Sequence, residues 1–120
     1  MGRSTISELE YNFAENGTGI VEAVFRDEAG QLVVPKSATW TLTDEDGDVK
    51  NAREDVAISP LDSTVSIVLA GDDLALSTGF SGVAEKRIIL IRAVYDSTDY
   101  GNDLPLNQQV IFCIDNLAAI

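Results

Sequence analysis

The chain has 120 residues, with 20 Asp or Glu against 8 Lys or Arg, so its net charge at pH 7 is −12. This length suits a single core, and the negative charge repels phosphate backbones, which argues against direct binding to DNA or RNA. Histidine is absent, which removes the commonest general base and the usual zinc ligand. We therefore expect neither an enzyme nor a bound cofactor.

The single cysteine, Cys113, lies in the apolar stretch VIFCIDN and cannot form an internal disulfide. We expect it to be a small core residue. The N-terminal stretch MGRSTISELEYN has no apolar run typical of a signal peptide, and no segment reaches the ~20 apolar residues of a membrane span. We expect a protein made without export and without contact with a membrane.

Five stretches carry apolar side chains at alternate positions, the pattern of strands with one face on a core. These stretches are 18–26, 37–43, 63–69, 86–95 and 107–115. Gly, Pro, Asn and Asp lie between them as turn signals. Short strands separated by turns predict an all-β fold, and we expect one antiparallel β-sandwich of the immunoglobulin-like (Ig-like) or fibronectin-type-III-like kind over residues 18–120.

Three further segments carry weaker signals. Residues 1–17 are polar enough to be either a first edge strand, within 4–13, or a loose arm. The stretch DVAIS, 55–59, could add a short edge strand, and 71–78 contains a possible single helical turn.

The acidic stretch TWTLTDEDGDVKN, residues 39–51, resembles a metal loop at first sight. An EF-hand needs glycine at its sixth position and glutamate at its twelfth. Counted from Asp44, Gly47 is fourth and Asp55 is twelfth, so the motif fails. Asp-Gly between two alternating runs instead predicts a hairpin, in which strand 37–43 pairs within its own sheet with a strand at 48–52.

The predicted hairpin also determines which loops lie at the same end of the sandwich. Loops 14–17, 44–48 and 70–85 would share one end, and loops 27–36, 53–62 and 96–106 the other. A weak Ca²⁺ site therefore stays open as the alternative to a solvated turn. Its ligands would be Asp44, Asp46, Asp48, Asp72 and Asp73.

Large apolar side chains in polar loops are candidates for contacts with other proteins. Phe80 lies in STGFSGVAE and Tyr100 in DYGND. Each could also fold back as a lid on the end of the sandwich. The residues that we predict for protein contacts are Phe80, Tyr100, Leu104, Tyr11 and Phe13.

Four stretches, ATWTLTDEDGDV, VSIVLAGDDLAL, IRAVYDS and LPLNQQVIFCIDNL, resemble the small Ig-like accessory proteins encoded among the virion genes of tailed bacteriophages. The resemblance covers residues 18–120. It is carried by a Trp-bearing strand with its D-x-D-G turn and by an L-x-G-D-D-L corner. The matching residues are Trp40, Asp44, Asp46 and Gly47, and Leu69, Gly71, Asp72, Asp73 and Leu74.

The resemblance implies a structural protein of the virion, either a head decoration protein that stabilises the capsid or a head–tail neck component. Its partners would be the major capsid protein, the portal or neck, or other virion proteins, with many copies or a homo-oligomer in each particle. It would be made in the host cytoplasm. The alternative is an Ig-like adhesion or carbohydrate-binding module.

Overall fold

The computed structural model describes the backbone of residues 5–119 and the side chains of residues 12–118. Within these residues the chain forms seven strands and two 3₁₀ turns, with no α-helix. They are β1 (Thr5–Ala14), β2 (Thr18–Val24), β3 (Ser37–Thr43), β4 (Val56–Ala57), β5 (Thr64–Ala70), η1 (Gly71–Leu74), β6 (Ala84–Ser97), β7 (Gly101–Asp115) and η2 (Leu117–Ala119). The predicted all-β class is confirmed.

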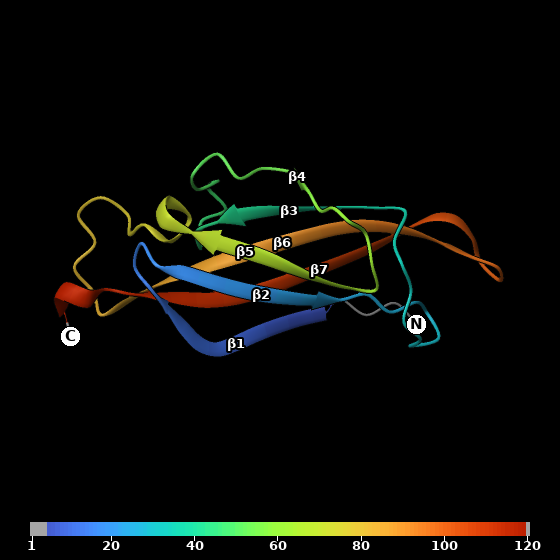
Figure 1. Cartoon of the computed structure of the whole chain (residues 1–120), viewed down its shortest axis with the longest axis horizontal. Helices are drawn as coiled ribbons and strands as arrows, with labels where there is room; N and C mark the ends of the chain where they lie inside the picture. Colours follow the sequence, from blue (N-terminus) through green and yellow to red (C-terminus); the bar gives the residue numbers. More distant parts are fainter. Residues whose placement is uncertain (1–4, 120) are drawn as a thin grey trace.

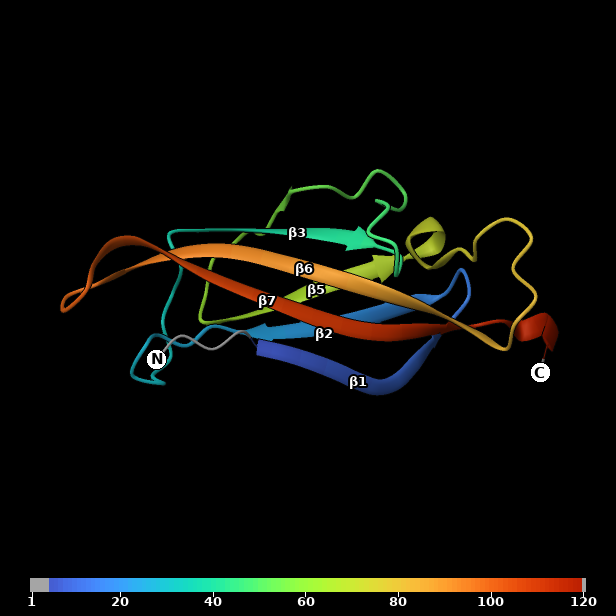
Figure 2. The ribbon, with the colours of Figure 1, turned by 180° about the vertical axis from the view of Figure 1, so that it is seen from behind.

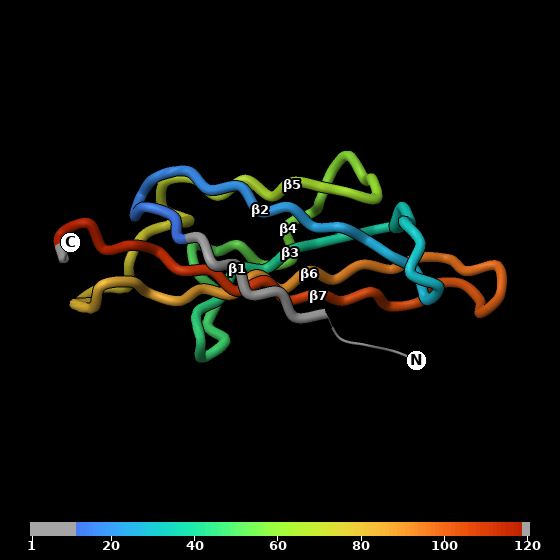
Figure 3. Tube along the Cα trace, turned by 90° about the horizontal axis from the view of Figure 1, so that it is seen from below, coloured from blue at the N-terminus to red at the C-terminus, as the bar shows by residue number. Residues whose placement is uncertain are grey.

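The strands form two open sheets. The larger has the order β1-β7-β6-β3-β4, in which β1 pairs with β7 in parallel and the other pairs are antiparallel. The smaller consists of β2 and β5, paired antiparallel. Figure 1 and Figure 2 show the two sheets from opposite sides, and Figure 3 shows β2 and β5 as a separate layer.

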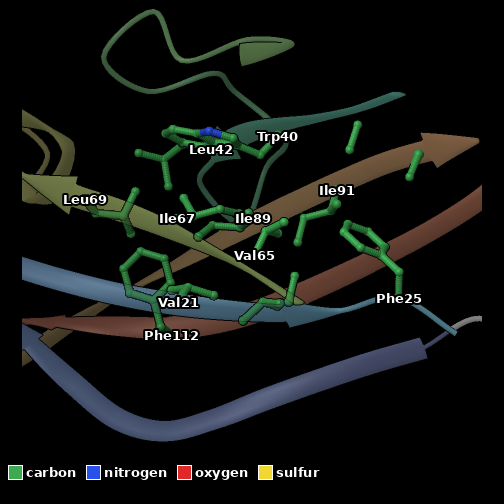
Figure 4. Packing of buried hydrophobic residues seen from close by; sticks show 14 of the residues in the cluster. Val21, Phe25, Trp40, Leu42, Val65, Ile67, Leu69, Ile89, Ile91 and Phe112 are labelled. Carbon is green, nitrogen blue, oxygen red and sulfur yellow. The ribbon is translucent and has the colours of Figure 1, made fainter. Parts of the chain in front are cut away.

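One apolar cluster joins the two sheets. In β2 and β5 burial alternates strictly along the strand, so every second side chain enters the core and the others face solvent. Figure 4 shows the buried side chains between the ribbons of the two layers. The cluster consists of Val21, Ala23, Phe25, Ala38, Trp40, Leu42, Val65, Ile67, Leu69, Leu74, Ile89, Ile91, Ala93, Val110, Phe112 and Ile114.

The longest feature is the β6–β7 hairpin, whose pairing runs from Ala84 and Asp115 to Ser97 and Gly101. It makes the molecule elongated, with extents of 52 × 25 × 21 Å, and its tip projects beyond the other strands (Figure 1). Our prediction placed a loop at 96–106, which is wrong, because β7 already begins at Gly101. The pairing of main-chain groups extends through a stretch that has no apolar alternation.

Pro105 lies within this early part of β7, opposite Val94. The carbonyl of Val94 accepts a hydrogen bond from the Lys36 N–H on its other side, so Val94 and Pro105 form a pair without mutual hydrogen bonds. The missing N–H of Pro105 therefore falls on the side of β7 away from β6, where the pairing with β1 in the described residues begins only at Gln108. Proline is tolerated at such an edge.

Residues 5–14 form β1 at the edge of the larger sheet, while residues 1–4 of the predicted arm or edge strand lie outside the described part. The register of β1 along β7 shifts between Glu8 and Asn12. Beyond this shift, the ring of Phe13 packs against Phe112 with 5.3 Å between centroids. The ring also lies over Gly19, where a Cβ would come within 2.6 Å of it. The absence of a side chain at Gly19 therefore allows Phe13, at the end of β1, to pack directly over β2.

We expect Gly19→Ala to destabilise the fold by about 1–3 kcal/mol, because a methyl group would overlap the Phe13 ring. In a Phe13→Ala background most of that cost should disappear, since the overlap is gone. Urea denaturation of the two single variants and the double variant measures both quantities. An equal cost of Gly19→Ala in the two backgrounds would contradict this placement of β1.

Candidate functional site

The three carboxylates of the acidic stretch do come together. One oxygen from each of Asp44, Asp46 and Asp48 lies within 4.8 Å of the others. Asp44 is half-buried and the other two are exposed. A cation could be coordinated by such a group of oxygens only if they were free to turn toward it.

Asp44 is already engaged in the turn itself. Its Oδ1 accepts the N–H groups of Asp46 and Asp48 at 2.9 and 3.0 Å, and Lys50 Nζ lies 3.5 Å from Oδ2. The Asp48 N–H, together with the smaller effects of the Asp46 N–H and Lys50, lowers the pKa of this carboxyl despite its partial burial. Gly47 adopts a φ of +88°, as the turn requires. The stretch is therefore built as a turn.

The predicted strand at 48–52 is reduced to one bridge, between Thr43 and Val49. The pairing of this segment with the Trp40 strand is thus confirmed, but the strand itself does not form. Asn51 and Ala52 adopt left-handed backbone angles instead. The short edge strand suggested at 55–59 exists as β4, paired with Thr39 and Trp40.

The carboxylate of Asp73 explains why the strand ends early. Asp73 is 3% exposed and accepts hydrogen bonds from Asn51 Nδ2 at 2.8 Å and Arg53 Nε at 2.7 Å. It also accepts the N–H of Ala70 at 3.2 Å. These bonds draw residues 51–53 toward η1 and away from a strand. The guanidinium of Arg53 in turn lies 5.9 Å from the Trp40 ring centroid.

Burial alone would raise the Asp73 pKa, but the hydrogen bonds from Arg53, Asn51 and Ala70 outweigh it and lower the pKa below its usual 3.8. The Ca²⁺ set that we considered is therefore divided. Asp44, Asp46 and Asp48 form one group, Asp73 is paired with Arg53, and Asp72 is exposed on η1. Loop 53–62 also begins at the opposite end from the one predicted, since Arg53 contacts Asp73.

A buried arginine anchors the loop that follows η1. The Arg87 side chain is 1% exposed and forms an ion pair with Glu85 at 3.0 Å. Its Nη2 also donates to the Ala75 carbonyl, and Glu85 accepts the N–H of Ser77 at 2.8 Å. Burial would raise the Glu85 pKa, but the Ser77 N–H and Arg87 lower it overall. This network holds the base of loop 75–83 against β6.

The opposite end of the molecule is held by Lys36. Its Nζ lies 2.7 Å from Asp103 and 3.3 Å from Asp96, and the hydrogen bonds to Asp103 and then Asp96 raise the Lys36 pKa. Tyr95 donates its hydroxyl to Glu28 at 2.9 Å. The predicted neighbourhood of loops 27–36 and 96–106 is confirmed by these contacts.

Tyr100 is the clearest surface aromatic among the described side chains. It is 70% exposed and lies at the tip of the β6–β7 hairpin, next to Asp99. Leu104 lies in β7 opposite Tyr95 and is half-buried. The hairpin thus carries one largely exposed aromatic ring, that of Tyr100, at its tip.

The other predicted contact residues are placed differently. Phe80 is half-buried and lies so close to Gly82, in its own loop, that a Cβ there would come within 2.7 Å of the ring. Phe13 packs on the core, as described above. Tyr11 lies in β1, and its side chain falls outside the described residues.

Sequence reasoning missed an exposed apolar face on the small sheet. Ile20 and Val68 are opposite one another and are 54% and 57% exposed, and Val24 is 39% exposed. The signal was present in the sequence, because Ile20 and Val24 interrupt the polar positions of the alternation. Val83, 65% exposed in the loop before β6, was also missed.

Comparisons with protein-family models, with curated proteins and with solved structures found no match. In residues 5–119, no helix has the length and apolar character needed to cross a membrane.

We expect Asp73→Asn to lower the free energy of unfolding at pH 7 by about 2 kcal/mol, because hydrogen bonds to a buried charged group are lost or weakened. The folded-state pKa of Asp73 is lowered, so its contribution is complete above the unfolded pKa and is lost as the pH falls through the folded pKa. The difference in the free energy of unfolding between wild type and variant should therefore become smaller below about pH 4. Urea titrations at several pH values measure it.

The matched control for this experiment is Asp72→Asn, which removes the neighbouring, exposed carboxylate. It should change the stability at pH 7 by less than about 0.5 kcal/mol. If Asp73→Asn lowers the free energy of unfolding by the same amount down to pH 2, the stabilising role of the Asp73 charge is contradicted.

We also expect about 10 mM Ca²⁺, roughly ten times the Kd of weak extracellular sites or more, to leave the melting temperature unchanged. Mg²⁺ at the same concentration controls for ionic strength. A rise in melting temperature with Ca²⁺ that Asp46→Asn abolishes would show that the turn binds the ion.

Proposed function

We propose that this chain is an Ig-like β-sandwich that serves as an accessory structural protein of a tailed-bacteriophage virion and acts through protein–protein contacts. It is a head decoration protein or a head–tail neck component, made in the host cytoplasm and present in multiple copies. The proposal takes its setting from the resemblance of residues 18–120 to such proteins. Its mode of action comes from the geometry of the β6–β7 hairpin.

The order of strands supports the Ig-like part of the proposal. In an Ig-like sandwich, strands B and E share one sheet and strands C, F and G share the other. Here β2 and β5 form one sheet, and β3, β6 and β7 are neighbours in the other. The chain order of these elements agrees with this assignment, with β1 as strand A.

The observation that carries the proposed contact is Tyr100. Tyrosine is enriched at the energetic centres of protein interfaces because its ring is large, rigid and amphipathic. A ring 70% exposed at a projecting tip keeps most of its area available for a partner. Lys36, Asp96 and Asp103 brace the hairpin below the tip, which limits the entropy lost when a partner binds.

The acidic surface suits contacts at such a projection. A chain with a charge of −12 repels copies of itself, so neighbouring copies on a shell stay apart unless a third protein holds them. A projecting tip lets each copy bind a shell while its body stays in solvent. Repetition of modest contacts over a lattice then gives stable attachment.

We expect mass spectrometry of purified virions to find the chain, and Tyr100→Ser to lower the amount bound to particles that lack it by about tenfold or more, as for an interface hot spot. Co-sedimentation with the particles measures the binding. The matched control is Val83→Ser, which removes an apolar side chain of similar exposure at the opposite end of the hairpin and should bind as wild type. Absence of the chain from virions would overturn the proposal.

A further inference from the structure

The small sheet has a free edge that can accept another strand. β5 is paired only with β2 among the described strands. The N–H of Phe25 donates to the Ser63 carbonyl, and the N–H of Gly71 donates to the Gly17 carbonyl. In this register the odd-numbered residues of β5 therefore bond to β2.

The even-numbered residues consequently direct their main-chain groups to the outer edge. Ala70 confirms this alternation, because its N–H bonds to the carboxylate of Asp73. The N–H and C=O groups of Thr64, Ser66 and Val68 point away from β2 in the same way. An open row of such groups pairs readily with an extended segment.

A groove of about 380 Å³ runs along this edge. One wall is formed by residues 64–68 of β5, and the other by the segment 57–62 that links the two sheets. Trp40 and Ile58 also line it. A strand added to β5 would place every second side chain in this groove and the others on the solvent side.

We propose that the β5 edge binds an extended segment of a partner protein by strand addition. The segment alternates apolar residues, which enter the groove, with neutral or basic residues. The preference for positive charge comes from the surroundings, since β2, β5 and residues 57–62 contain Glu22 and Asp62 but no Lys or Arg. Arg53, which lies over the Trp40 ring, is already paired with Asp73. An acidic strand would therefore add to the negative charge of a chain of net charge −12.

A second copy of the chain fits this edge less well. If two β5 strands paired, Val65 and Ile67 of each would remain in their own cores, because they are buried there. Thr64, Ser66 and Val68 would face solvent, and neither groove would be filled. The pairing would also bring a second Asp62 to the same edge.

The test uses the full chain and a capped nine-residue peptide that alternates valine with lysine and threonine. The readout is amide hydrogen exchange by NMR at Thr64, Ser66 and Val68, together with titration of amide shifts. We expect about 1 mM peptide to slow exchange at these three amides. A peptide with glutamate in place of lysine should bind at least about fivefold more weakly.

Two variants locate the binding. Ser66→Pro removes an N–H that does not bond to β2, so the fold should tolerate the change. The affinity for the peptide should fall about tenfold or more. Ser66→Thr keeps the N–H and should bind the peptide as wild type does.

The inference is overturned if the basic peptide leaves exchange at the three amides unchanged, or if the acidic peptide binds equally well. Protection of these amides in the free chain that rises with its concentration would assign the edge to a second copy instead. The inference does not depend on the proposed function, because a chain absent from virions can still bind a strand at this edge.

Discussion

The shared apolar layer between a two-stranded and a five-stranded sheet is the constraint on which the rest of the structure depends. Two strands alone are not stable in water, so β2 and β5 persist because Val21, Ile67 and their neighbours are buried against the larger sheet. The smaller sheet cannot cover all of the larger one. Trp40 lies where this cover ends, with Arg53 over its ring and the groove beside β5 next to it. The open edge and the groove therefore both result from the unequal number of strands.

Polar contacts complete the two ends of this layer, where main-chain groups leave the sheets. At one end the buried Asp73 binds the segment 51–53, and Arg87 with Glu85 holds the next loop. At the other end Lys36 joins two acidic residues of the hairpin, Asp96 and Asp103. In each case a cation paired with one or two carboxylates lowers the local repulsion in a strongly acidic chain. The ends are thus fixed by charge pairs and the middle by apolar packing.

The sequence predicted those elements that place apolar side chains in the core. Strand 37–43 was predicted with its observed bounds, and 63–69 differs from β5 by one residue at each end, because alternation reports burial directly. It did not predict that β7 begins at Gly101, since that part of the strand is held by main-chain pairing with β6. It also predicted a strand at 48–52 where Asp73 imposes a turn. A contact between residues 20 positions apart leaves no periodic signal.

The candidate sites divide in the same way. Proximity of Asp44, Asp46 and Asp48 followed from their spacing, and Tyr100 at a loop tip followed from its polar neighbours. The β5 edge could not be predicted, because a strand looks the same in sequence whether or not another strand lies beside it. Only the register shows which main-chain groups point outward, and only the path of residues 57–62 forms the groove. Asp62 on one wall and Glu22 on the neighbouring β2 then restrict the partner further, since a strand that fits this edge must also avoid adding carboxylates to it.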